Sequence, residues 1–198
     1  MCAKLLILES PGKVKKVQSF LGPDWKVVAS VGHVRDLPVK EMGVAAPDFK
    51  PHYQPTERGA DVLKRLGALA KQADVVYLAT DPDREGEAIA WHVADALKLK
   101  DAKRVTYGEI TESAVKAAVQ SPRAIDMALV AAQEGRRVLD RFCGYLVSGP
   151  LSRAVGTRLS AGRVQSPALR LVVERERAIT SFVSVTHYGA ELSFEGWK

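Results

Sequence analysis

The sequence predicts an α/β domain with a mainly parallel sheet flanked by helices, followed by part of a mainly helical domain. Short apolar stretches alternate with stretches of helical periodicity through the first 120 residues. Alternation of this kind is typical of parallel sheets with crossover helices. After Pro122 the strand-like stretches give way to two long helical patterns.

The first elements are short and clearly bounded. Residues 4–8 (KLLIL) form an apolar run typical of a buried strand, and Ser10-Pro11-Gly12 is a turn. Residues 13–21 have helical spacing and end at Gly22-Pro23, which predicts a helix. Residues 25–31 (WKVVASV) predict a second strand, and the prolines between residues 37 and 56 predict a loop.

The next elements continue the alternation. Apolar side chains at helical spacing predict helices over 59–73 and 85–97, with an apolar strand over 75–79 (VVYLA) between them. Residues 104–107 are expected to form another strand. A helix over 111–119 would open at Thr111, a favoured N-cap residue.

The change of pattern near residues 120–124 predicts a boundary between one domain over 1–122 and a second over 123–198. In the second domain, residues 125–151 and 164–180 have the periodicity of long helices.

The last residues indicate a further element. Residues 187–197 alternate between polar and apolar side chains, as a strand does. The sequence then stops at Lys198 without a closing element, so we expect a fragment of a longer protein.

Composition excludes several classes of protein. Hydrophobic residues make up 46% and charged residues 26% of the 198 residues, which argues against disorder. No apolar run approaches the roughly 18–20 residues that a membrane span needs, and the N-terminal run is too short for a signal peptide. Only Cys2 and Cys143 are present, which excludes a disulfide framework and a Cys-x-x-Cys zinc site. We therefore expect an intracellular protein with no membrane partner.

Positive charge is concentrated in the second part of the chain. The formal net charge is +6, and residues 121–198 supply +4 of it, with ten arginines among eleven basic residues. Arginine makes planar, bidentate contacts with phosphate, so this bias favours a polyanionic partner. A salt-bridged, solvated helix surface is the alternative that charge alone leaves open.

The strongest local signal is an acidic cluster, Thr80-Asp81-Pro82-Asp83-Arg84-Glu85-Gly86-Glu87, between a predicted strand and a predicted helix. Ligand sites of open α/β sheets lie beyond the carboxyl ends of strands, and carboxylate oxygens are ligands that Mg²⁺ prefers. Helix capping explains one or two of these acids but not both aspartates. An EF-hand loop fits poorly, because its twelfth position is His92 rather than glutamate.

Glu9 and Lys13 follow the first predicted strand. Because parallel strands end at the same sheet edge, Glu9 is expected to meet Asp81 and Asp83, where it could share a metal or donate a proton. A lone surface acid is the alternative for Glu9. The Gly-Lys of Glu9-Ser10-Pro11-Gly12-Lys13 lacks the other residues of a phosphate loop, so no ATP site is expected.

Six motifs follow one another along the chain: ESPGK at 9–13, SVGHVRDLP at 30–38, the block 79–92, EIT at 109–111, RRxxDR at 136–141 and LSAGRVQS at 159–166. Together they resemble the bacterial type IA DNA topoisomerases and their Rossmann-like toprim domain. The resemblance covers essentially the whole chain in order. The acidic cluster alone would leave toprim nucleases and primases open, and the last two motifs favour topoisomerases.

The resemblance implies relaxation of negatively supercoiled DNA without ATP. A tyrosine would cleave one strand through a 5′-phosphotyrosine link, and strand passage and religation would follow. By similarity, Glu9 would be the general acid and Lys13 would steady the scissile phosphate. Asp81, Asp83 and Glu85 would join Glu9 as catalytic residues and ligands of the cofactor Mg²⁺.

The resemblance also implies a groove for single-stranded DNA. Its DNA-binding residues would be His33, Arg84, Arg136, Arg137, Asp140, Tyr145, Arg153, Ser160, Ala161, Gly162, Arg163, Val164 and Gln165. An arginine-lined groove with occasional base stacking suits single strands. A salt-bridged helix surface remains the alternative for the arginines, and core packing the alternative for Tyr145.

The nucleophilic tyrosine of the family stands in a Pro-Arg-Thr-Asp-like motif that this sequence lacks. We therefore expect the chain alone to bind Mg²⁺ and single-stranded DNA but not to relax DNA. We also expect a monomer in the cytoplasm, associated with the nucleoid. The open alternatives are a stand-alone DNA-binding module and a toprim nuclease or primase.

Overall fold

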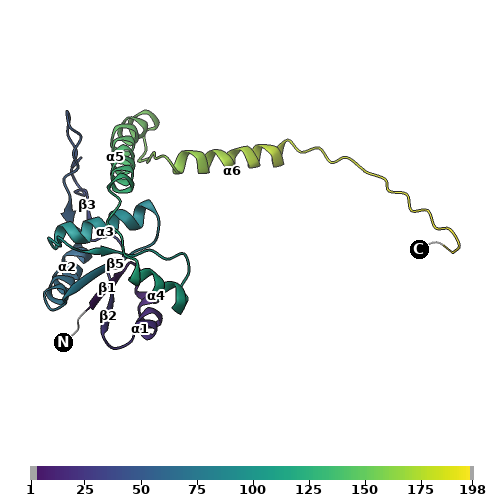
Figure 1. The fold of residues 1–198 in the computed structure, drawn as a ribbon. Coiled ribbons are helices and arrows are strands. Elements are labelled where there is room, and N and C mark those ends of the chain that lie inside the picture. The colour runs from purple at the N-terminus through teal and green to yellow at the C-terminus, as the bar shows by residue number, and fades with distance from the viewer. Residues whose placement is uncertain (1–3, 197–198) are drawn as a thin grey trace. The chain divides into compact units, whose positions relative to one another are not determined.

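The computed structural model describes residues 4–196, and its first part is an α/β unit built on a parallel sheet (Figure 1). The strands lie in the order β2-β1-β5-β6, with bounds Trp25–Ala29, Lys4–Leu8, Val75–Ala79 and Lys103–Arg104. All neighbouring strands of this sheet are parallel, and Leu8 lies opposite both Ala29 and Ala79. The carboxyl ends of β1 and β5 are therefore adjacent.

Helices cover both faces of this sheet. On one face, α2 (Glu57–Ala70) and α3 (Arg84–Ala96) contribute Leu66 and Val93 to a core with Ile7 and Leu78. On the other face, the short helix η1 (Pro11–Lys13) is followed by α1 (Val14–Leu21), which packs with α4 (Glu112–Gln120). Burial on both faces explains the uninterrupted apolar run of β1. The predicted fold class is confirmed.

The proline-rich stretch is mostly loop, as predicted. It is enclosed by a short antiparallel pair, β3 (Arg35–Asp36) and β4 (Gln54–Pro55). Strand β3 places Arg35 and Asp36 near α3, where both line a polar pocket described below.

Two long helices follow the α/β part: α5 (Met127–Val155) and α6 (Gln165–Thr180). The chain divides into two compact units between Tyr145 and Leu146. The first turns of α5 therefore belong to the α/β unit. The predicted domain limits, 1–122 and 123–198, stay a prediction.

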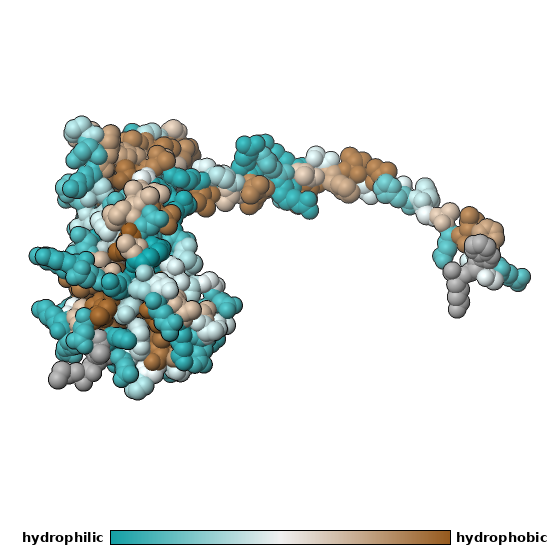
Figure 2. Space-filling model, viewed as in Figure 1, coloured by the Kyte–Doolittle hydropathy of each residue, from teal (hydrophilic) through white to brown (hydrophobic). Residues whose placement is uncertain are grey.

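The second unit exposes apolar side chains. Every residue of α6 is exposed, and Figure 2 shows hydrophobic side chains along α6 and the segment after it. They include Leu171, Val172, Phe182 and Tyr188.

The predicted strand over 187–197 is wrong for the part that the structure describes, because residues 187–196 contain no strand. Residue 197 lies outside the described residues. A strand needs a neighbour to satisfy its backbone N–H and C=O groups, and no described strand pairs with this segment. None of the helices in residues 4–196 is long and apolar enough to cross a membrane.

Candidate metal and nucleic-acid site

Four of the predicted site residues meet at the carboxyl edge of the sheet. Glu9 follows β1, Asp81 follows β5, and Asp83 is the N-cap of α3. Lys13, at the end of η1, places its Nζ 2.7 Å from Asp81 Oδ1. The parallel register of β1 and β5 is what brings these distant parts of the sequence together.

The environment of Glu9 favours its protonated form. The pKa of Glu9 is raised above its usual value by burial first and then by the carboxylates of Asp81 and Asp83. The backbone N–H of Asp81 and the ammonium of Lys13 lower that pKa, but their effect is smaller. Glu9 can thus hold a proton more readily than an exposed glutamate.

The acidic loop between β5 and α3 is tightly built. Asp83 Oδ1 accepts a hydrogen bond of 2.7 Å from Gly86 N, which caps α3. Thr80 Oγ1 donates to the carbonyl of Gly86. A Cβ at Gly86 would overlap the backbone of Asp81, so only glycine allows the loop to fold back this closely.

Glu85 faces away from the acidic edge towards α5. Its Oε2 lies 3.2 Å from His33 Nε2 and accepts from Gln133 Nε2 at 3.3 Å. These residues line a cavity of about 300 Å³ together with Arg35, Asp36, Tyr53, His92, Arg136, Arg137 and Asp140. Glu85 is therefore a residue of both the acidic loop and this polar pocket. Arg84 is exposed at the first residue of α3.

The arginines of α5 are paired with acids from two elements. Arg137 donates to Asp36 from Nε at 2.8 Å and from Nη2 at 2.7 Å. Arg136 Nε lies 3.7 Å from Asp140 Oδ2, one helical turn away. All four side chains remain between 33% and 43% exposed, so a phosphate could compete with the carboxylates for them.

A second cavity, of about 340 Å³, adjoins the first and shares Asp36, Arg137 and Asp140 with it. Tyr145 lines it, with its hydroxyl donating to Val39 O at 2.9 Å and the Arg141 guanidinium 5.2 Å from its ring centroid. The ring is 42% exposed, which leaves room for a base to stack.

His92 is buried and lines the first cavity. Arg35 donates from Nε to His92 Nδ1 at 3.3 Å, and its Nη1 pairs with Asp95 Oδ2 at 2.7 Å. Burial first, then the charges of Arg35 and His33, lower the pKa of His92 to about 3. Because Nδ1 accepts this hydrogen bond, the ring proton must be on Nε2.

This depressed pKa makes stability depend on pH. In the unfolded chain the ring of His92 binds a proton near pH 6.5, and in the folded chain only near pH 3. The neutral ring therefore contributes fully to the free energy of unfolding above pH 6.5, and this contribution is lost as the pH falls towards 3. We expect the difference in unfolding free energy between wild type and His92→Gln to narrow by about 1–2 kcal/mol from about pH 7 to about pH 5. Urea titrations at both pH values measure it, and a difference that does not change with pH would contradict the assignment.

A buried ion network lies behind the acidic loop. Glu87, whose side chain is fully buried, accepts from Arg104 Nε at 2.9 Å, and both of its oxygens accept from Arg123 at 2.8 Å. Burial raises the pKa of Glu87, but hydrogen bonds from Arg123, Asp126 N and Arg104 outweigh it, so the pKa is lowered. Arg104 also donates to the carbonyls of Thr80 and Asp81, both at 2.8 Å.

The remaining predicted DNA-binding residues lie in the second unit. Ser148 Oγ accepts from Ala161 N at 2.9 Å, and Ser152 Oγ accepts from Leu159 N at the same distance. Ser160 Oγ donates to Gln165 Oε1 at 3.2 Å at the start of α6. These bonds hold the turn 159–165 against the end of α5. Arg153, Arg163 and Val164 are exposed.

The fit of the acidic edge to a metal rests on its donor set. Within residues 4–196, no group of three or more His, Cys, Asp or Glu side chains is arranged to hold a metal. Burial first, and then the carboxylates of Asp81 and Asp83, nevertheless raise the pKa of Glu9, so the three acids lie close enough to interact. Mg²⁺ usually keeps several waters and binds through one or two carboxylates, so this set fits that ion.

Sequence reasoning gave no role to several residues of the site: Arg35, Asp36, Tyr53, Gln133 and the Glu87–Arg104–Arg123 network. One signal could have found Arg104, because a charged residue at the start of a predicted core strand needs a buried partner. The pairing of Asp36 with Arg137 spans 101 residues and has no local signal.

Comparisons with known proteins match both parts of the chain. The family model described as a Toprim domain matches residues 4–112, and the one described as a DNA topoisomerase matches residues 124–197. The chain belongs to the bacterial type IA DNA topoisomerase family. The predicted family resemblance is therefore confirmed.

Individual relatives agree with the family models. A plasmid DNA topoisomerase I of Xylella fastidiosa (strain 9a5c) is 65% identical over 195 residues, which are 98% of this chain and 30% of the relative. The structure of full-length topoisomerase I from Thermotoga maritima matches with a TM-score of 0.77 and 44% identity, over 90% of this chain and 31% of that chain. The chain thus spans about three-tenths of these relatives.

Proposed function

We propose that this chain supplies the Mg²⁺ site and part of the single-strand groove of a type IA topoisomerase. That enzyme would relax negatively supercoiled DNA by cleaving one strand through a 5′-phosphotyrosine link, passing a strand and religating, without ATP. It would act as a monomer on nucleoid DNA in the cytoplasm. The observation that carries the proposal is the position of Glu85, which joins the acidic edge to the arginine-lined pocket.

The acidic edge suits proton transfer at a phosphodiester. Glu9 has a raised pKa, so it can protonate the 3′ oxygen that leaves when a strand is cut. Lys13 is within 2.7 Å of Asp81 and can turn its ammonium to a phosphate oxygen. Asp81 and Asp83 would hold Mg²⁺, whose charge would offset that of the DNA backbone, and Glu9 would join them only in its deprotonated form. Glu85 is directed towards His33 and Gln133, away from this edge.

The pocket suits a single strand. Arg136 and Arg137 would exchange Asp140 and Asp36 for phosphates, and Tyr145 would stack on a base. His33 and Arg84, at the rim of the acidic loop, would contact the backbone of the same strand. In the second unit, the exposed Arg153 and the turn Ser160–Gln165 would extend the contacts, since backbone N–H groups at a helix start bind phosphate.

None of the five tyrosines stands in the motif that carries the nucleophile of the family, and four of them are engaged within the fold. Burial raises the pKa of Tyr107 to about 12, and burial first and then the carboxylate of Glu134 raise the pKa of Tyr53. Tyr77 packs against Trp25, and the Tyr145 hydroxyl donates to Val39 O. A tyrosinate is therefore not favoured at Tyr53 or Tyr107.

The combination Asp81→Asn with Asp83→Asn tests the metal site. Both changes keep the side-chain volume, and asparagine is also a good N-cap, so the loop should fold. We expect Mg²⁺ affinity by calorimetry to fall about tenfold or more and affinity for single-stranded DNA to stay within about twofold. Asp61→Asn, an exposed acid on α2, is the matched control. Unchanged Mg²⁺ binding would favour a DNA-binding module without metal chemistry.

A plasmid assay separates the enzyme classes. Negatively supercoiled plasmid is incubated with the chain and Mg²⁺, and an aliquot is quenched in denaturant to trap a covalent adduct. We expect no relaxation, no nicking and no adduct. Metal-dependent nicking would favour a toprim nuclease. Relaxation with an adduct would place a nucleophile within these residues and contradict the assignment of the tyrosines.

A further inference from the structure

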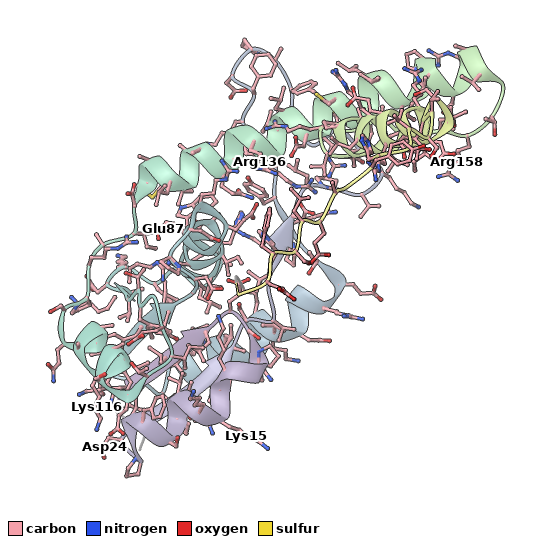
Figure 3. All side chains as sticks on the ribbon, turned by 90° about the vertical axis from the view of Figure 1, so that its right-hand side faces the viewer. Lys15, Asp24, Glu87, Lys116, Arg136 and Arg158 are labelled. Carbon is pink, nitrogen blue, oxygen red and sulfur yellow. The ribbon has the colours of Figure 1, made fainter. Side chains whose placement is uncertain are left out.

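Glu87 joins two parts of the molecule that the proposed function uses separately (Figure 3). Its Oε1 accepts from Arg123 Nη1 at 2.8 Å and from the backbone N–H of Asp126 at 2.6 Å. Its Oε2 accepts from Arg104 Nε at 2.9 Å and from Arg123 Nη2 at 2.8 Å. These four bonds fill the roughly four acceptor positions of a carboxylate.

One side of this junction is the acidic loop. Arg104 is fully buried and donates to Glu87 while its Nη atoms hold the carbonyls of Thr80 and Asp81. The backbone of Arg104 also pairs with that of Arg123 in both directions, at 2.9 and 2.8 Å. Arg123 is thus fixed to the sheet by its main chain and to α3 by its side chain.

The other side of the junction is the start of α5. Asp126 donates its N–H to Glu87, and its Oδ1 accepts from Ala128 N at 2.9 Å and Leu129 N at 3.2 Å. The same helix carries Arg136 and Arg137. Figure 3 labels Glu87 on α3 and Arg136 further along α5.

Helix α5 is held by charged contacts at two places. One is the Arg123–Glu87 pair just before its first residue, and the other is the bidentate Arg137–Asp36 pair. A phosphate that binds Arg137 would break the second contact, because one guanidinium group cannot make bidentate hydrogen bonds to a phosphate and to Asp36 at once. Neither Arg123 nor Glu87 lines the pocket, so the first contact would remain.

We propose that Arg123 is a positioning residue that, through Glu87, fixes the start of α5 so that Arg136 and Arg137 meet a single strand in register with the acidic loop. The inference rests on the proposed function, since it concerns the same groove. Arg123 itself makes no DNA contact. Its fork geometry matters because both Glu87 oxygens are engaged at once.

The test compares single-strand binding by the whole chain and its variants, by fluorescence anisotropy of a labelled oligonucleotide over a series of salt concentrations. The Arg123 side chain is 41% exposed, and Arg104 still balances Glu87 without it, so Arg123→Ala should fold. Circular dichroism and thermal unfolding check this. Lys116→Ala, which removes the same charge from an exposed pair on α4, is the matched control.

We expect Arg123→Ala to weaken binding about tenfold, the lower end of what supporting residues around a site contribute. The slope of log affinity against log salt should equal that of wild type, because no phosphate contact is lost. Arg123→Lys should restore part of the affinity, and Lys116→Ala should change neither quantity.

Two results would overturn the inference. Unchanged affinity with lowered thermal stability would show that Arg123 only supports the fold. A slope reduced by about 0.7 would show that Arg123 contacts a phosphate directly. A wild-type chain that does not bind single-stranded DNA would overturn the proposed function itself. The wild-type titration alone shows this, so it is distinguished from a failure of the inference about Arg123.

Discussion

Replacing Glu87 with alanine is expected to lower the free energy of unfolding by about 3–5 kcal/mol. The change leaves Arg104, which has no exposed surface, without its counter-charge, and it removes hydrogen-bond acceptors from Arg123 and Asp126 N. Breaking a buried pair by removing one partner is costly because the remaining charge cannot reach water. Urea unfolding followed by circular dichroism measures the loss.

Glu112→Ala is the control for this experiment. Glu112 pairs with Lys116 at 2.6 Å on α4, but both side chains are more than half exposed. Exposed pairs of this kind contribute about 0–1 kcal/mol, so the control should differ little from wild type. A loss for Glu87→Ala no larger than that for Glu112→Ala would contradict the description of the network.

The second large effect concerns DNA. Arg136→Ala together with Arg137→Ala is expected to weaken binding of single-stranded DNA about tenfold or more at low salt and to reduce its salt slope by about 1.4, roughly 0.7 for each phosphate contact. The physical reason is that fewer neutralised phosphates release fewer counterions. Fluorescence anisotropy over a salt series measures both quantities.

A charge-matched pair of substitutions separates this effect from net charge. Lys64→Ala with Lys116→Ala removes two positive charges from the exposed faces of α2 and α4. That variant should keep the wild-type slope. If the arginine variant also keeps it, Arg136 and Arg137 do not contact the DNA, and their pairs with Asp140 and Asp36 serve the fold alone.

Much of the α/β unit could be predicted from local sequence. KLLIL and VVYLA are short apolar runs typical of strands buried on both faces, and they form β1 and β5 as expected. Because parallel strands share an edge, the meeting of Glu9 with Asp81 and Asp83 also followed from the sequence, and the electrostatic contacts of Glu9 agree with it.

The orientation of individual side chains could not be predicted from the sequence. Asp83 and Glu85 are two residues apart in the acidic motif, yet Asp83 caps α3 while Glu85 faces His33 and Gln133. Glu87 points into the core and meets two arginines from later in the chain. Successive residues of a helix differ in direction by about 100°. The acidic side chains of one motif therefore lie in three different environments: the cap of α3, the polar pocket and the core.

The expected strand near the end of the chain failed for a related reason. Alternation over residues 187–196 describes the two faces of a strand, but a strand also needs a hydrogen-bonded neighbour. The pattern holds no information about whether one is present. The pair of Asp36 and Arg137 likewise depends on tertiary packing, for which the local sequence contains no signal.

The most direct test of the central claim is binding of the wild-type chain, in Mg²⁺, to a single-stranded oligonucleotide and to the duplex of the same sequence. The two adjoining cavities, lined by Arg136, Arg137 and Tyr145, offer phosphate contacts and a stacking ring, which favour exposed bases. We expect the single strand to bind at least about tenfold more tightly than the duplex. Equal affinity for the two, or no binding to either, would contradict the account.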